Sequence, residues 1–351
     1  MRTVIIAALA LAATGTGLLA HDAGSSGPYK VLKTVKTGGD GGFDYVYADS
    51  AGRRLYIPRS GANARISVFN LDTLEAVGEI PKVSARGAAV DPVSHHGFSS
   101  SKPVAMWDAG TLAVIKTIDV EGNPDGILFD PFNARVYVLS HSAPNATVID
   151  AKDGSVVGTI DLGGAPEQAV TDGKGHLYID LEDKDTVAVV DATTLKVTAR
   201  YPLNGKGGEP AGLGFDVKNG ILFVGCHDPQ TMVVLNAADG KILATLPIGA
   251  GVDGTLFNPA TMEAFSSQGD GTLTVVKESS PTSFAVEQTV KTMTRAKTLT
   301  LDTKTNHILL IAAEFTPPPP APVGAAPAAG GRGRGRGQLV PDSFSILVVG
   351  K

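Results

Sequence analysis

The sequence repeats one pattern about every 42 residues, and this repeat limits the folds that the chain can adopt. The clearest copy runs from Gly122 to Leu162 and holds four short apolar runs, ILF, VYV, TVID and VVGTI. Turn-forming residues separate the runs, among them the segment DPFN from Asp130 and the pair Asp153–Gly154, which favours a tight hairpin. Because the runs are short and rich in Val, Ile and Tyr, each copy predicts a four-stranded antiparallel sheet.

Seven copies of the pattern follow one another along the chain. An acidic or amide residue, here called the anchor, ends the first strand of each copy. The anchors are Asp49, Asp91, Asp130, Asp172, Asp216, Asn258 and Asp302. The third strand also recurs, as ISVFN, VAMWD, TVID, VAVVD, MVVLN, LTVV and FSILVV. A repeat of this length with four strands in each copy predicts a β-propeller, in which each copy forms one blade.

The last copy indicates how the ring closes. After Asp302 it supplies HILLIAA and FSILVVGK, but no fourth strand follows. Residues 31–39, VLKTVKTGG, match the missing strand and precede the first anchor. We therefore expect the N-terminal strand to complete the last blade, because this removes the open edge between the first and last blades. The predicted fold is all-β: a seven-bladed β-propeller with four antiparallel strands per blade, in a single domain over residues 29–351.

The repeat resembles a known family. The pattern DPxxxxxYVxxxxxxxVxVIDxxTxxVVxTIxVG is similar to the YVTN-type repeat of YncE-like periplasmic β-propellers, and the resemblance covers residues 29–351. It is best preserved as VYVLS from Val136, TVIDAKDGSVVGTIDLG from Thr147 and LYIDLEDKDTVAVVDATTLKV from Leu177. Propellers that resemble this one serve as periplasmic or surface binding scaffolds, as lactone-cleaving enzymes and as cofactor domains of denitrification enzymes. The resemblance therefore implies the fold more closely than the function.

The N-terminal segment indicates export. Residues 1–20 combine Arg2, the apolar run VIIAALALAATGTGLLA and small residues, which predicts a secretory signal peptide cleaved after Ala20. An uncleaved anchor helix is the alternative. Residues 21–28 then form a flexible lead-in, and the mature protein is periplasmic or secreted, with no membrane span after cleavage. Cys226 is the only cysteine, so no intramolecular disulfide is possible. We interpret it as a small buried thiol, although the neighbouring His227 leaves a catalytic thiolate open.

The most informative set of polar residues follows from propeller geometry. The first strand of each blade lines the central channel, so the residue five positions before each anchor is expected at the channel mouth. These residues are Asp44, Arg86, Asp125, Glu167, Ala211, Asp253 and Lys297. Six of the seven are charged, although charged residues make up 19% of the chain. The ring can pair internally, bind a small polar or cationic ligand or a protein partner, or hold Ca²⁺ or Mg²⁺ through its four carboxylates.

A second ring is expected in the loops that follow the second strands. It contains Arg59, Ser101, Lys102, His141, Glu182, His227 and Gln268. His141 and His227 could act as acid–base groups at the channel mouth, because histidine titrates near neutral pH, or they could have structural roles. Two histidines at equivalent positions are too few for a copper cluster, and nothing identifies a haem pocket. The catalytic residues therefore stay unassigned, and no metal or cofactor is predicted, although a divalent cation remains possible.

Residues 316–341, TPPPPAPVGAAPAAGGRGRGRGQLVP, interrupt the last blade between its second and third strands. This Pro/Gly/Arg-rich insertion is expected to loop out as a solvated tether. Arg332, Arg334 and Arg336 could make weak contacts with nucleic acid. The net charge of −5 gives the body of the protein no basic surface for such a partner.

Two functional hypotheses remain. The first, which we favour, is a binding or scaffold propeller with a ligand or partner at the charged channel mouth. The second is a metal-assisted hydrolase or lyase similar to lactonase-type propellers. Arg86 and Lys297 count against the second, because cations in the same ring oppose a metal ion.

Overall fold

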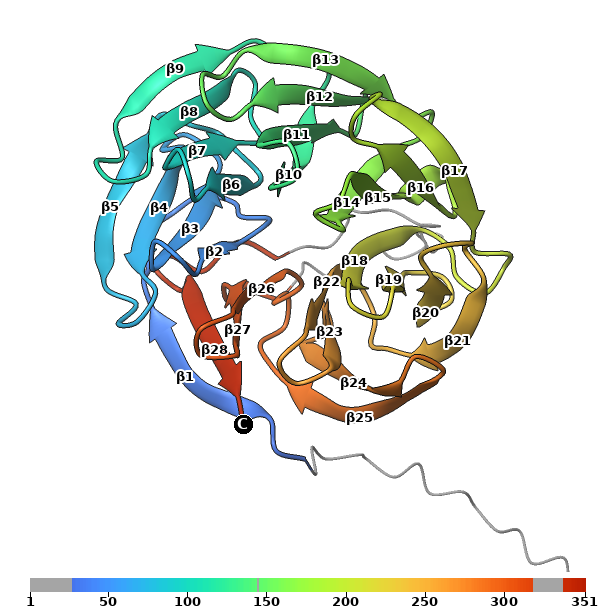
Figure 1. Cartoon of the computed structure of the whole chain (residues 1–351). Coiled ribbons are helices and arrows are strands. Elements are labelled where there is room, and N and C mark those ends of the chain that lie inside the picture. Colours follow the sequence, from blue (N-terminus) through green and yellow to red (C-terminus); the bar gives the residue numbers. More distant parts are fainter. Residues whose placement is uncertain (1–26, 144, 318–336) are drawn as a thin grey trace, which may run out of the picture.

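The structure, a computed structural model, describes residues 27–143, 145–317 and 337–351. These residues form seven four-stranded antiparallel sheets arranged in a ring (Figure 1). The predicted seven-bladed β-propeller is therefore confirmed. The predicted signal peptide, most of the lead-in, and Arg332, Arg334 and Arg336 of the insertion lie outside the described residues. No helix among the described residues is long and apolar enough to cross a membrane.

Six blades each use four consecutive strands. The first three contain β2 (Tyr47–Asp49), β3 (Arg54–Arg59), β4 (Arg65–Asn70) and β5 (Ala76–Pro81); β6 (Ala88–Asp91), β7 (His96–Ser99), β8 (Val104–Asp108) and β9 (Val114–Ile118); and β10 (Pro124–Asp130), β11 (Arg135–Ser140), β12 (Asn145–Asp150) and β13 (Val156–Asp161). The next three contain β14 (Pro166–Thr171), β15 (His176–Leu181), β16 (Thr186–Asp191) and β17 (Lys196–Pro202); β18 (Pro210–Asp216), β19 (Ile221–Cys226), β20 (Thr231–Asn236) and β21 (Ile242–Pro247); and β22 (Val252–Asn258), β23 (Glu263–Gln268), β24 (Thr272–Ser280) and β25 (Ser283–Lys291). A short 3₁₀ helix, η1 (Glu182–Lys184), follows β15.

The seventh blade joins the two ends of the chain. It contains β26 (Leu299–Asp302), β27 (His307–Ala312), β28 (Ser345–Gly350) and, as its outermost strand, β1 (Lys30–Lys36). β1 pairs antiparallel with β28, with Thr34 opposite Leu347. The N-terminal strand therefore closes the ring as predicted. The flanks of the insertion also pair, because Phe315 and Leu339 form an isolated antiparallel bridge.

The anchors explain why each blade turns where it does. In every blade, the anchor side chain accepts a hydrogen bond from a backbone N–H two or three residues further on, at 2.7 to 3.2 Å. Asp, Asn and Ser residues favour such turns because their short side chains replace a backbone acceptor. The anchor thus fixes the turn between the first and second strands. The residues predicted at the channel mouth lie at the opposite end of the first strand.

Apolar side chains fill the spaces between adjacent blades. The cluster between the third and fourth blades includes Tyr137, Leu139, Leu177 and Ile179, all buried. Each strand alternates its side chains between the two faces of its sheet, so each blade packs apolar side chains against the blade on either side. This packing holds the first strands of neighbouring blades side by side around the axis.

Candidate functional site

One half of the predicted channel-mouth ring is a chain of ion pairs, here called the paired arc. Nη1 of Arg86 lies 3.1 Å from Oδ2 of Asp125 and 3.3 Å from Oδ2 of Asp44. Nζ of Lys297 lies 3.2 Å from Oδ1 of Asp44 and also contacts the carboxylate of Asp253. These five residues come from five neighbouring blades. On this side, the interpretation that the ring charges pair with one another agrees with the structure.

Burial and charge act in opposite directions on the two cations. Burial lowers the pKa of Arg86, but the carboxylates of Asp125 and Asp44 outweigh it and raise the pKa. The pKa of Lys297 is raised in the same way, because Asp253 and Asp44 outweigh its burial. Both cations therefore remain charged at physiological pH.

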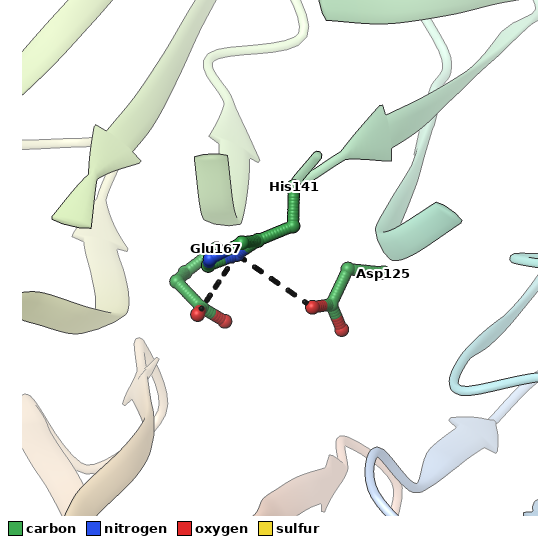
Figure 2. Close-up of side chains that lie close together, drawn as sticks. All are labelled: Asp125, His141 and Glu167. Atoms are coloured by element: carbon green, nitrogen blue, oxygen red, sulfur yellow. Dashed lines mark ion pairs between the residues drawn. The ribbon is translucent and has the colours of Figure 1, made fainter. Parts of the chain in front are cut away.

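The other half of the predicted mouth is an acidic arc of Asp125, Glu167 and Glu182 around the imidazole of His141. Figure 2 shows His141 between Asp125 and Glu167. Nδ1 of His141 lies 3.3 Å from Oε1 of Glu167 and 3.8 Å from Oδ2 of Asp125, and Nε2 lies 3.7 Å from Oε2 of Glu182. Asp125 and Glu167 lie in first strands, whereas His141 and Glu182 follow second strands. The two predicted rings therefore meet in one cluster.

Two further residues, Tyr45 and Asp180, support this arc, and neither was predicted as a site residue from the sequence. The hydroxyl of Tyr45 lies 3.2 Å from the backbone carbonyl oxygen of Glu167 and 3.3 Å from its Oε2. Asp180 is fully buried behind Glu167, and its Oδ1 accepts the backbone N–H of Gln168 at 2.5 Å. Tyr45 directly follows Asp44 in the sequence, and this neighbour could have indicated its place in the site. Asp180 lies within the apolar run LYIDL, which gave no indication of a polar site.

The acidic arc holds groups that titrate near neutral pH. Burial raises the pKa of Asp125 to about 7, and the nearby Glu167 carboxylate adds to the effect while Arg86 opposes it. Burial also raises the pKa of Asp180 well above its ordinary value. The Glu167 carboxylate raises the pKa of His141, against the effect of burial. On the paired arc, burial raises the pKa of Asp253 to about 6, with Lys297 opposing.

Three other residues considered from the sequence, Ala211, His227 and Cys226, are not part of this cluster. Ala211 leaves the fifth blade without a ring charge. The backbone N–H of His227 donates to the carbonyl oxygens of Gly208 and Glu209, at 3.1 and 3.3 Å, and His227 is not part of the Asp125–His141–Glu167 group. Cys226 is fully buried, and burial raises the pKa of its thiol to about 12. A catalytic thiolate therefore has no support from its surroundings.

A cavity of about 510 Å³ opens beside the paired arc. Its walls include Asp44, Arg86, Ser60, Ser101, Lys102 and Asn123. The lining is polar and mixed in charge, and the volume is within the range of small-molecule sites. Arg86 belongs both to this cavity and, through Asp125, to the acidic arc. A ligand in the cavity would therefore lie close to the carboxylate cluster.

Comparisons with known proteins establish the fold alone. No family model matches the chain, and no curated protein sequence matches it. A chain in "Crystal Structure of Mitotic Checkpoint Complex" is similar in structure, with a TM-score of 0.68 and 12% identity, covering 88% of this chain and 96% of that chain. "Structure of U3-55K" also matches with a TM-score of 0.68 and 12% identity, covering 91% of this chain and 98% of that one.

Proposed function

We propose that this protein is an exported, YncE-like β-propeller that binds a small polar ligand with a positively charged group at its channel mouth. The observation that carries the proposal is the acidic arc. There the carboxylates of Asp125, Glu167 and Glu182 surround one imidazole, and Arg86, at the edge of the arc, is shared with Asp44. The YncE-like resemblance supports a binding role in the periplasm or outside the cell.

The physical basis is the cost of burying negative charge. Asp125 is only 3% exposed, and a buried carboxylate is stable in its charged form only beside sufficient positive charge. A cationic ligand supplies that charge. Part of its binding free energy therefore comes from stabilising the buried carboxylate of Asp125. A narrow mouth lined by carboxylates also raises the local concentration of cations. The adjoining cavity of about 510 Å³ gives the rest of the ligand a polar wall.

The test is a screen of small cationic and polar compounds against the purified mature protein, followed by thermal shift and calorimetry in the presence of a metal chelator. Asp125→Asn and Glu167→Gln should each weaken the binding of a hit at least tenfold. Glu79→Gln, which changes an exposed carboxylate on β5, should leave binding unchanged. Binding that survives both mouth substitutions would locate the site elsewhere. A screen that yields only a protein partner would replace the small-ligand proposal.

A second candidate function, a metal-assisted hydrolase or lyase of a lactone-like substrate, is favoured by one observation. His141 lies between carboxylates that can accept or orient its protons, an arrangement suited to acid–base chemistry. Hydrolysis of a lactone panel that depends on added divalent metal and on His141 would support it. No turnover with any lactone, with or without metal, would remove it.

Export is tested separately. Mass spectrometry of protein from the periplasmic and culture fractions should find a mature N-terminus at His21. An intact N-terminus in the membrane fraction would favour the uncleaved anchor helix instead.

A further inference from the structure

Three potential metal ligands converge in the acidic arc. One side-chain donor atom from each of Asp125, His141 and Glu167 lies within 4.8 Å of the other two. Nδ1 of His141 lies 3.3 Å from Oε1 of Glu167 and 3.8 Å from Oδ2 of Asp125. Ligands about 2.1 Å from a tetrahedral zinc ion are separated from one another by about 3.4 Å. These two separations therefore already approach those of a coordinated metal ion (Figure 2).

One buried atom of this group, Oδ1 of Asp125, has no hydrogen-bond partner among the residues that the structure describes. Nδ1 of His141 is also buried, and it lies against the carboxylates of Glu167 and Asp125. Buried polar atoms in folded proteins are almost always satisfied, and an ion is one of the explanations for an exception. Asp125 is only 3% exposed, so solvent does not supply the missing partner. The terminal torsion of an aspartate is broad, so a small rotation can present either oxygen to an ion.

Two of the three side chains are also contacted at the polar atom that does not face the group. The hydroxyl of Tyr45 lies 3.3 Å from Oε2 of Glu167, whereas Arg86 contacts Oδ2 of Asp125, the oxygen that also faces His141, at 3.1 Å. Nε2 of His141 faces the carboxylate of Glu182 at 3.7 Å. A carboxylate on the outer nitrogen of a metal-binding histidine fixes its tautomer and ring orientation. Glu167 and His141 thus each present one donor to the group and have an outer contact on their other polar atom.

We propose that Asp125, His141 and Glu167 form a binding site for a divalent transition metal of the zinc type, an inference that rests on the proposed role of the mouth in binding cations. An imidazole donor suits zinc-type metals, which also bind carboxylate oxygens, whereas Ca²⁺ takes six to eight oxygen ligands. The four-carboxylate Ca²⁺ or Mg²⁺ site considered from the sequence does not form, because Asp44 and Asp253 contact Lys297 instead. Three protein ligands leave one tetrahedral position for water or a ligand.

The test is a titration of chelator-treated protein with Zn²⁺ in competition with a chromophoric chelator, repeated with Co²⁺ to record its visible absorption. We expect one ion per chain, and a Co²⁺ spectrum of a four- or five-coordinate site. His141→Gln and Glu167→Gln should each weaken binding by about 100-fold or more, and Tyr45→Phe by about 10-fold. Two ligand variants are used so that a folding defect in one does not decide the result, and circular dichroism checks each fold.

His176→Ala is the matched control. His176 also lies against a carboxylate, with Nδ1 at 2.8 Å from Oδ2 of Asp172, but it begins β15 and so lies at the opposite end of the blades. This variant should bind Zn²⁺ as the parent protein does, and Ca²⁺ or Mg²⁺ should not compete. An equal loss of Zn²⁺ affinity in the His176→Ala control, or unchanged Zn²⁺ affinity in both ligand variants, would overturn the proposed metal site.

The outcome is separable from that of the proposed function, because the ligand screen is run with a chelator present. Failure of Zn²⁺ to bind while an organic cation binds through Asp125 would overturn only the metal site. If Zn²⁺ binds but the screen finds no organic ligand, the metal site is supported and the small-ligand proposal is contradicted.

Discussion

The ammonium of Lys351 lies over the ring of Tyr29, 4.9 Å from its centre, although the two residues come from opposite ends of the described chain. Both also contact the same buried carboxylate in the sixth blade. The hydroxyl of Tyr29 donates to Oε2 of Glu263, and Nζ of Lys351 lies 2.9 Å from Oε1. The side chain of Gln288 exchanges two hydrogen bonds with the Tyr29 backbone, at 3.0 and 2.7 Å. The ring is therefore fastened across the boundary between the sixth and seventh blades as well as by strand pairing.

This junction predicts that Glu263 is important for stability. Glu263→Ala should lower the free energy of unfolding by about 2 kcal/mol, because it leaves Tyr29 and Lys351 without their shared acceptor. Denaturant unfolding of the purified protein measures the change. Glu79→Ala, at an exposed position, should cost less than about 0.5 kcal/mol. Equal effects of the two substitutions would mean that the junction does not stabilise the ring.

Ring closure itself gives a second prediction. Deleting residues 27–37 removes β1 and leaves β28 as an uncovered edge strand. We expect loss of cooperative unfolding and concentration-dependent aggregation, because an exposed edge strand pairs with other chains. Size-exclusion chromatography and thermal unfolding measure both. A deletion that stays monomeric and unfolds as sharply as the parent would show that β1 is dispensable.

The pair of Asp302 and Arg53 predicts a loss of stability in acid. Nη1 of Arg53 lies 2.7 Å from Oδ1 of Asp302, joining the seventh blade to the first. Burial raises the pKa of Asp302, but hydrogen bonds from Arg53 and Thr305 outweigh it and hold the pKa at about 2. The ionised pair therefore stabilises the fold above the ordinary aspartate pKa of about 3.9, and this stabilisation is lost as the pH falls from there through about 2.

Asp302→Asn tests this expectation. It should cost about 2 kcal/mol at pH 6 and progressively less toward pH 2. Denaturant unfolding at pH 6, 4 and 2.5 gives the comparison. A cost that does not change with pH would mean that the ion pair is not its source.

Glu278 predicts the opposite dependence on pH. It is buried at the end of β24 away from the mouth, and burial raises the pKa of its carboxyl to about 7, even though Asn219 donates to its Oε1 at 2.8 Å. A raised carboxyl pKa means that the folded state binds the proton more tightly than the unfolded state. Stability is therefore fully present below the ordinary glutamate pKa of about 4.3 and falls as the pH rises through about 7.

Glu278→Gln mimics the protonated form and keeps the acceptor for Asn219. The substitution should raise the free energy of unfolding by about 2 kcal/mol at pH 8 and change it little at pH 4. Thermal or denaturant unfolding at both pH values measures the difference. A gain of the same size at pH 4 would refute the assignment.

Cys226 should be unreactive in the folded protein. Its thiol is fully buried and its pKa is raised to about 12, so little thiolate forms at neutral pH. A chromogenic disulfide reagent should react at the rate of unfolding in native buffer and rapidly in denaturant. Rapid reaction of the native protein would restore the thiolate interpretation.

Local chemistry explains what could be predicted from the sequence. Each anchor is an Asp or Asn that caps its own turn, so the turn and the strands on either side are determined within a few residues. Apolar alternation then specifies the strands. Because the copy that begins at Asp302 has only three strands, the N-terminal strand β1 was expected to complete its sheet. Counting back from the anchors identified charged residues at equivalent positions of successive blades, because strands have a fixed rise per residue, and five of these residues contact one another.

The partners of those charges depend on contacts between blades that are remote in sequence. His141 and His227 hold equivalent positions, yet only His141 belongs to the three-residue group with Asp125 and Glu167. Arg86 contacts Asp44 and Asp125 from the blades on either side, and Lys297 joins the first and sixth blades in the same way.

The repeat therefore specifies the form of each blade and the number of blades, because both follow from turns and strands a few residues long. Which carboxylates contact cations and which lie around His141 depends on contacts between blades. Those contacts arise when seven separate segments are packed around one axis, and their distances and burial set the electrostatics of the mouth.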